Sequence, residues 1–148
     1  MKRRFALATA CALSGAMVGA CSSGDSGDLT VAEAWTRATP PGAEVAAFYL
    51  TVDNGADAPD ELLSATSPRC AMAELHRSEV VDDLMQMGPA TAQDLTVDAG
   101  QEMVFEPTGL HVMCMGMTEP IVDGDQIELT LEFANAGRVV TTVTVGEP

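Results

Sequence analysis

The chain has 148 residues, of which 22 are acidic, 7 are lysine or arginine and 2 are histidine, giving a formal net charge of −15. Every acidic residue lies beyond position 20, and no lysine follows Lys2. Such a surface attracts cations and repels nucleic acid and anionic lipid headgroups, which excludes a nucleic-acid partner. The length suits a single domain with one core.

The N-terminal segment is typical of an exported protein. Residues 2–4 are basic, and the apolar run from Phe5 to about Ala20 is too short and too rich in small residues to span a membrane. We therefore predict a signal peptide over residues 1–20. The run ends in Val18-Gly19-Ala20-Cys21, which resembles a bacterial lipobox, the signal in which the cysteine is lipidated and begins the mature protein. The alternative is an ordinary signal peptide in which Cys21 is incidental.

After this segment, residues 21–28 are expected to form a lipidated Cys21 and a flexible polar tether, and residues 29–148 the folded domain. Short β-rich runs separated by Gly, Pro, Asn and Asp predict an all-β sandwich or barrel. The predicted strands cover residues 45–52, 70–76, 101–106, 110–117, 126–133 and 138–145. The clearest is 126–133, where apolar and polar residues alternate.

The four cysteines differ by position. Cys11 lies in the predicted signal peptide and Cys21 is the proposed anchor, which leaves Cys70 and Cys114. Two thiols in an oxidising compartment most simply form a disulfide, although free thiols remain the alternative.

Both histidines and most methionines fall in one stretch of the chain. Apart from Met1 and Met17, the methionines all lie between residues 72 and 117: Met72, Met85, Met87, Met103, Met113, Met115 and Met117. His111 and Met113 are two residues apart and so share one side of a strand. The acidic segment 80–83 could turn a hairpin that brings Met87 back toward His76. We therefore predict a metal site formed by His76, Met87, His111 and Met113.

Imidazole and thioether ligands select a soft ion, and we expect one Cu(I) per chain. Methionine carries no proton and cannot be lost to a disulfide, so it remains a ligand where thiols are oxidised. The other methionines are expected to fill gaps in the core, with Met85 and Met115 as reserve ligands. Glu74 is expected to be a solvated carboxylate, and the alternative is a contact to His76 from outside the ligand set.

The same region carries a family resemblance. Several segments resemble the PCuAC family of periplasmic copper chaperones. They are residues 34–42, 47–54 and 65–68, Glu74-Leu75-His76, residues 110–116, Pro120 and Gly124-Asp125. That family's signature is a His, ten residues, a Met, about twenty-one residues, and then His-x-Met. Ten residues separate His76 from Met87, and the final pair matches; the middle gap is slightly longer, with twenty-three residues. Arg77 occupies the position where the family sometimes has a further Met.

The resemblance implies a cupredoxin-like Greek-key β-sandwich that delivers Cu(I) to the CuA centre of cytochrome c oxidase or to a Sco-type partner. A lipid anchor would hold it at the outer face of the cell membrane. The cysteine pair lies outside the signature, and Cys114 stands beside Met113, so an additional ligand role for Cys114 is open. A regular strand would point Cys114 away from the ligands, which favours the disulfide.

Two other classes of function compete with this reading. One is a metal-free surface lipoprotein or interaction module. The other is an electron-transfer cupredoxin, whose blue copper needs a Cys thiolate; here His111 precedes Cys114, the reverse of the usual order. The chain has no phosphate-binding glycine loop, nucleophile elbow or redox Cys-x-x-Cys, so we do not predict an enzyme.

Overall fold

The computed structural model describes residues 28–146, so the predicted signal peptide and nearly all of the predicted tether lie outside the described residues. The described part is all-β, as predicted. Its strands are β1 (Leu29–Thr36), β2 (Val45–Asn54), β3 (Asp60–Thr66), β4 (Met72–Val81), β5 (Leu84–Pro89), β6 (Thr96–Val97), β7 (Glu102–Phe105), β8 (Leu110–Met115), β9 (Gln126–Phe133) and β10 (Gly137–Val145). Within residues 28–146 no helix is long and apolar enough to cross a membrane.

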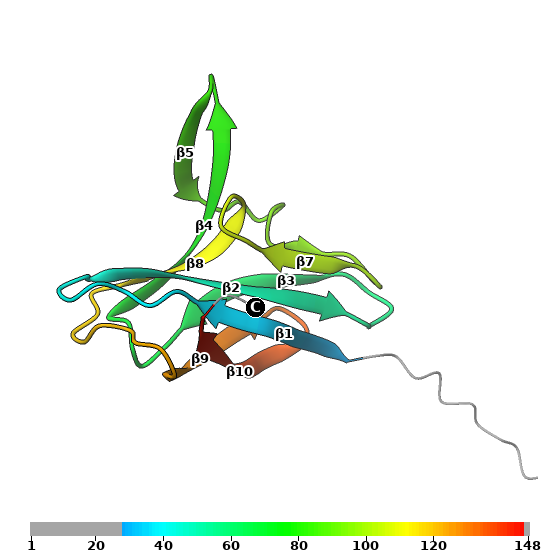
Figure 1. Cartoon of the computed structure of the whole chain (residues 1–148). Coiled ribbons are helices and arrows are strands. Elements are labelled where there is room, and N and C mark those ends of the chain that lie inside the picture. Colours follow the sequence, from blue (N-terminus) through cyan, green and yellow to red (C-terminus); the bar gives the residue numbers. More distant parts are fainter. Residues whose placement is uncertain (1–27, 147–148) are drawn as a thin grey trace, which may run out of the picture.

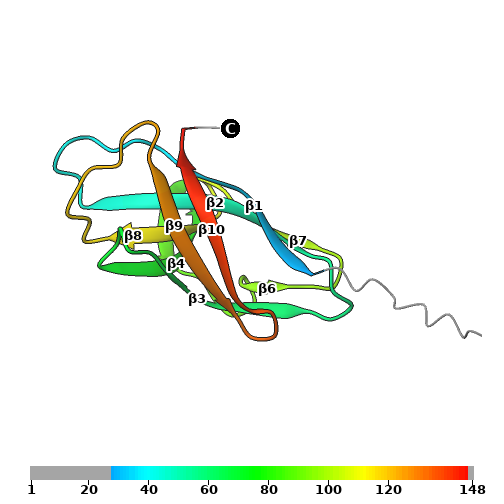
Figure 2. The same ribbon diagram turned by 90° about the horizontal axis from the view of Figure 1, so that it is seen from below.

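The strands form one continuous sheet in the order β5-β4-β8-β7-β2-β1-β10-β9-β3-β6. The sheet folds over on itself, so that β9 and β10 lie beneath β1, β2 and β8 (Figures 1 and 2). The only parallel contacts among the described strands are β1 with β10 and β7 with β8; the other pairs are antiparallel. This two-layered arrangement confirms the predicted cupredoxin-like sandwich.

The core lies between the two layers and follows from the alternation in the sequence. Ile127, Leu129, Leu131 and Phe133 of β9 are all at most 3% exposed, whereas their neighbours along the strand face outward. Across the core they meet β2, whose Phe48 is fully buried. Burial of each such side chain contributes about 1.5–3 kcal/mol, so these two strands hold the layers together. Among the described residues the core extends from Leu29 to Val145, so residues 28–146 include all the core packing that the structure describes.

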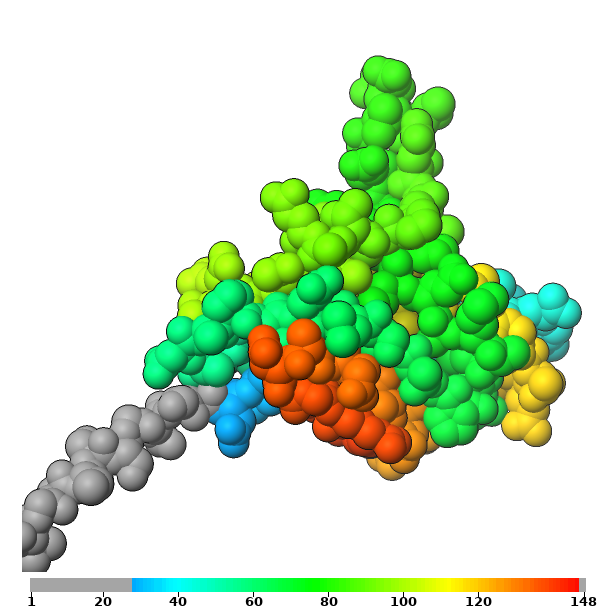
Figure 3. All heavy atoms as spheres, turned by 180° about the vertical axis from the view of Figure 1, so that it is seen from behind, coloured from blue at the N-terminus to red at the C-terminus, as the bar shows by residue number. Residues whose placement is uncertain are grey.

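The hairpin formed by β4 and β5 extends beyond the core and projects from the body of the molecule (Figures 1 and 3). Its turn is Asp82-Asp83, with φ of 53° and 62°, and Val81 pairs with Leu84 on either side. Two consecutive residues with positive φ make the turn that matches the twist of a hairpin, and Asp tolerates this conformation. The turn predicted over 80–83 is therefore confirmed, although β4 runs five residues further than the predicted strand.

Asp60, at the start of β3, is a buried carboxylate held by backbone donors. Its oxygens accept hydrogen bonds from the N–H groups of Glu61, Asn135 and Ala136 at 2.7–2.9 Å, which ties β3 to the turn between β9 and β10. Burial of the carboxyl acts to raise its pKa, but these N–H donors outweigh burial and hold the pKa below its usual value.

We expect Asp60→Asn to lower the free energy of unfolding by about 1–3 kcal/mol at pH 7, because an amide nitrogen would face a backbone N–H. In the wild type this stabilisation is complete above the unfolded pKa of about 3.9 and is lost as pH falls through the lower folded value. Urea unfolding at pH 7 and pH 3 measures both effects. The exposed Asp57→Asn serves as the control; an equal loss in both variants would contradict this role of Asp60.

Candidate metal centre

The register between β4 and β8 sets the two histidines opposite each other. These strands are antiparallel, with His76 paired to His111 and Glu74 to Met113. Residues that face each other across antiparallel strands lie on the same face of the sheet. The two imidazole centroids are 6.0 Å apart, with the rings nearly perpendicular at 78°. Strand pairing alone thus brings together two histidines that are 35 residues apart in the chain.

The β4–β5 hairpin adds Met87. Met87 pairs with Ser78 of β4, and its Sδ lies 3.1 Å from Nε2 of His111 on β8. The thioether therefore extends across β4 to reach the next strand. Ser78 is small and buried, which leaves room for this crossing. The acidic turn at 82–83 is what folds the chain back and so places a methionine from β5 against a histidine from β8.

Met113 lies two residues beyond His111 on the same face of β8. We call this the ligand face; the opposite face of β8 carries Leu110, Val112 and Cys114, which belong to the core. Met113 is only 9% exposed and His111 only 3%, although neither belongs to the core cluster. The structure thus places all four predicted ligands on one face of three adjacent strands, β5, β4 and β8.

The hydrogen bonds of His111 leave one of its nitrogens free to bind a cation. Its Nδ1 lies 3.1 Å from the carbonyl oxygen of Gly109, an acceptor, so Nδ1 carries the proton. Nε2 then presents a lone pair toward the sulfur of Met87, which has lone pairs and no proton of its own. Two lone-pair donors facing each other at 3.1 Å suit a soft cation as a third partner.

His76 presents a second free nitrogen. Its Nε2 lies 2.9 Å from Oε2 of Glu74, so the alternative reading of Glu74 holds rather than that of a solvated carboxylate. Its Nδ1 is buried and is the sole buried side-chain nitrogen or oxygen without a hydrogen-bond partner among residues 28–146. Buried polar atoms are nearly always satisfied, so an unpartnered one needs an explanation. When Nε2–H donates this hydrogen bond to Glu74, the Nδ1 lone pair is left for a metal ion, as in carboxylate–histidine–metal arrangements.

The electrostatics keep His111 neutral at neutral pH. Burial lowers its pKa, the hydrogen bond to the Gly109 carbonyl partly opposes this, and the neighbouring His76 lowers it further. A neutral imidazole is the form that binds metal, so no proton has to be displaced near pH 7.

The donor set of the site favours a soft ion over harder ones. No group of three or more His, Cys, Asp or Glu side chains within residues 28–146 is arranged to hold a metal ion. The side chains beside His76 and His111 on this face include the methionine sulfurs of Met87 and Met113. Thioethers favour Cu(I) over Ca²⁺, Mg²⁺ or Mn²⁺, so the residues present fit a monovalent copper ion.

The remaining methionines divide into two groups. Met103 and Met117 are buried in the core, as predicted. The core-filling prediction is wrong for Met72 and Met85, which are 53% and 56% exposed. Exposure matters here because an exposed thioether packs little and remains available to a metal ion. Met115, the other predicted reserve ligand, is half-buried on the ligand face.

The cysteines form the predicted disulfide. Cys70 and Cys114 are bonded with their Cα atoms 5.2 Å apart, and Cys114 is fully buried on the core face of β8. The suggestion that Cys114 is an additional ligand is therefore wrong, because its sulfur is in the disulfide and on the opposite face from His111. A blue-copper centre needs a thiolate, and the described residues contain no other cysteine to supply one.

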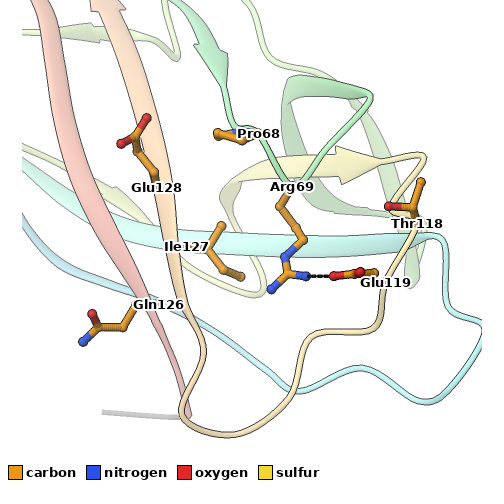
Figure 4. A pocket seen from close by; sticks show the side chains of 7 residues that line it. All are labelled: Pro68, Arg69, Thr118, Glu119, Gln126, Ile127 and Glu128. Atoms are coloured by element: carbon orange, nitrogen blue, oxygen red, sulfur yellow. Dashed lines mark hydrogen bonds and ion pairs between the residues drawn. The ribbon is translucent and has the colours of Figure 1, made fainter.

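A shallow pocket of about 380 Å³ lies away from these ligands, around Arg69 (Figure 4). It is lined by Pro68, Arg69, Thr118, Glu119, Gln126, Ile127 and Glu128. The guanidinium of Arg69 donates to Glu119 at 3.1 Å and to Asp125 at 2.9 Å. Its charge is therefore already paired within the protein, and these contacts fix the loop between β8 and β9 against the start of β4.

Solved structures with the same fold are PCuAC domains. The apo PCuAC domain from PmoF1 superimposes with a TM-score of 0.67 at 27% identity, covering 84% of this chain and 98% of that domain. The copper-bound PCuAC domain from PmoF2 gives a TM-score of 0.65 at 25% identity, covering 82% of this chain and 95% of that one. The fold and the paired histidines among methionines thus define a PCuAC-type copper-chaperone domain.

The sequence comparisons show the family to which the chain belongs. Residues 29–145 match the family described as "Putative lipoprotein LpqE-like", and the chain belongs to this LpqE-like family. A relative, "Putative lipoprotein Lxx21020" from Leifsonia xyli subsp. xyli (strain CTCB07), is 26% identical over 117 residues, which cover 79% of this chain and 69% of the relative. Both names describe lipoproteins, in agreement with the lipobox-like segment at Cys21 in the part of the chain outside the described residues.

Proposed function

We propose that this chain is an extracytoplasmic copper chaperone that binds one Cu(I) ion through His76, Met87, His111 and Met113. The observation that carries the proposal is the 3.1 Å approach of the Met87 sulfur to the unprotonated Nε2 of His111, beside the unpartnered Nδ1 of His76. Structural neighbours that bind copper support the same reading.

Such a ligand set suits transfer rather than storage. All four ligands are neutral, so the bound ion keeps its positive charge, and a partner that offers thiolates would bind it more tightly. Met87 is 54% exposed on the projecting hairpin, whereas His111 and Met113 are buried. A partner could therefore displace Met87 first while the buried ligands still hold the ion.

We further propose where the copper goes, and this part rests on the family resemblance. The recipient would be the CuA subunit of cytochrome c oxidase or a Sco-type protein. Lipidation of Cys21 would hold the domain at the outer face of the cell membrane, near such a recipient. The lipoprotein names of the family and of its relative support the anchor. The role is binding and delivery, not catalysis.

The direct test is an anaerobic Cu(I) titration of residues 28–146 in competition with a chromophoric chelator. We expect about one tightly bound equivalent, since the four proposed ligands lie on one face of three adjacent strands. Absence of competitive binding would overturn the proposal and would favour a metal-free surface module.

A further inference from the structure

Met72 and Met115 form a second pair of thioethers on the ligand face. They are direct partners across β4 and β8, in the same register that pairs Glu74 with Met113 and His76 with His111. The ligand face thus carries three successive cross-strand pairs. The histidine pair lies at one end, Glu74–Met113 in the middle and Met72–Met115 at the other end. Met72 is 53% exposed, so core packing does not account for it.

The backbone beneath this pair is fixed from two sides. Cys70, two residues before Met72, is bonded to Cys114, the residue before Met115. Gly116 follows Met115 with a φ of +67°. A Cβ placed on Gly116 would lie 2.7 Å from the Cβ of Ala71, so the backbone segments at Gly116 and Ala71 approach as closely as glycine allows. The disulfide and this close approach therefore fix the separation of the Met72 and Met115 backbones.

The spacing suits a shared ion. Directly opposed residues of antiparallel strands have Cβ atoms about 4.5–5.5 Å apart, within which two flexible thioethers can converge on one soft cation. Met113 adjoins the pair on the same strand and could serve as a third sulfur. The carboxylate of Glu74, between the pair and the histidines, adds a negative charge that favours a cation on this face.

We propose that Met72 and Met115 form a second, weaker Cu(I) site that adjoins Met113 and through which the ion enters or leaves the histidine site. This inference rests on the proposed function, because it extends the copper site along the same face. Movement of the ion between the sites is a ligand exchange, in which Met113 stays bound while the histidines and Met87 are replaced by Met115 and Met72. Neither the ion nor the protein changes oxidation state.

The test is an anaerobic Cu(I) titration of residues 28–146 carrying ¹³C-labelled methionine methyl groups, followed by NMR. The first equivalent should shift the methyl signals of Met87 and Met113, and the second those of Met72 and Met115. In the double variant Met72→Leu/Met115→Leu the affinity for the second equivalent should fall at least about tenfold, because leucine keeps the shape but removes the sulfur.

The control is Leu84→Ala, which removes an exposed apolar side chain without sulfur from the same hairpin and should leave both equivalents unchanged. Loss of the second equivalent in Leu84→Ala, or its retention in the double variant, would overturn the second site. Failure of the proposed function has a different signature: the methyl groups of Met87 and Met113 would stay unshifted at the first equivalent in the wild type. The experiment therefore distinguishes failure of the second site from failure of the proposed function.

Discussion

Replacing His111 by alanine, or Met87 by leucine, is expected to weaken Cu(I) binding by about 100-fold or more. Loss of a residue that merely orients a metal ligand already costs about 10–100-fold, and these two side chains would touch the ion. His111 should have the larger effect, because it is buried, whereas Met87 is 54% exposed. Met87→Leu keeps the apolar volume of the side chain and removes only the sulfur.

The measurement is the competition titration with the chromophoric chelator, run on each variant at equal protein concentration. Circular dichroism would verify that each variant folds, which we expect because neither residue belongs to the core. Met85→Leu is the comparison for Met87→Leu, since both methionines are exposed on β5 and the Met87 sulfur lies 3.1 Å from Nε2 of His111. An affinity that drops equally in Met85→Leu and Met87→Leu would contradict the assignment of Met87.

The shared face of the four proposed ligands could be predicted in part, because it depends on short spacings in the sequence. His111 and Met113 are two apart, and a strand places such residues on one face whatever its surroundings. The hairpin required only a turn signal and enough residues to return, and Asp82-Asp83 supplies the turn. What the spacing could not give is the register of β4 on β8, because pairing of distant strands depends on the whole sheet.

Several strands escaped prediction for physical reasons. In β1 the pairing with β2 shifts between Ala32 and Trp35, where Glu33 has a positive φ of 51°, so the alternation of inward and outward residues is broken. In β3 a similar shift falls between Leu62 and Ser64. A hydrophobic pattern detects a strand through its buried face, and these bulges blur that signal.

The hairpin was underestimated for a different reason. From Glu79 to Met87 every residue is exposed, so no core face imposes a period on this part of the chain. The predicted strand of residues 70–76 therefore stops five residues short of the end of β4, and β5 left no periodic signal at all. Burial also explains the misjudged Met72 and Met85, since a methionine count does not show which methionines reach the core.

Removal of the disulfide should cost about 4 kcal/mol of stability. The bond joins residues 44 apart, and closure of a loop of that length removes roughly this much free energy of chain entropy from the unfolded state. The double variant Cys70→Ala/Cys114→Ala avoids placing a free thiol or a hydroxyl in the fully buried position of Cys114. Urea unfolding at pH 7, compared with the wild type with and without reductant, measures the loss.

The same variant separates the structural role of the cysteines from any role in copper binding. Because Cys114 faces the core and the ligands face away from it, the folded variant should bind the first Cu(I) equivalent within about threefold of the wild type, a difference of well under 1 kcal/mol. The second equivalent, which depends on the fixed separation of Met72 and Met115, should weaken more. A stability change below about 1 kcal/mol would contradict the loop-closure argument, and loss of the first equivalent from a folded variant would show that the bond also shapes the histidine site.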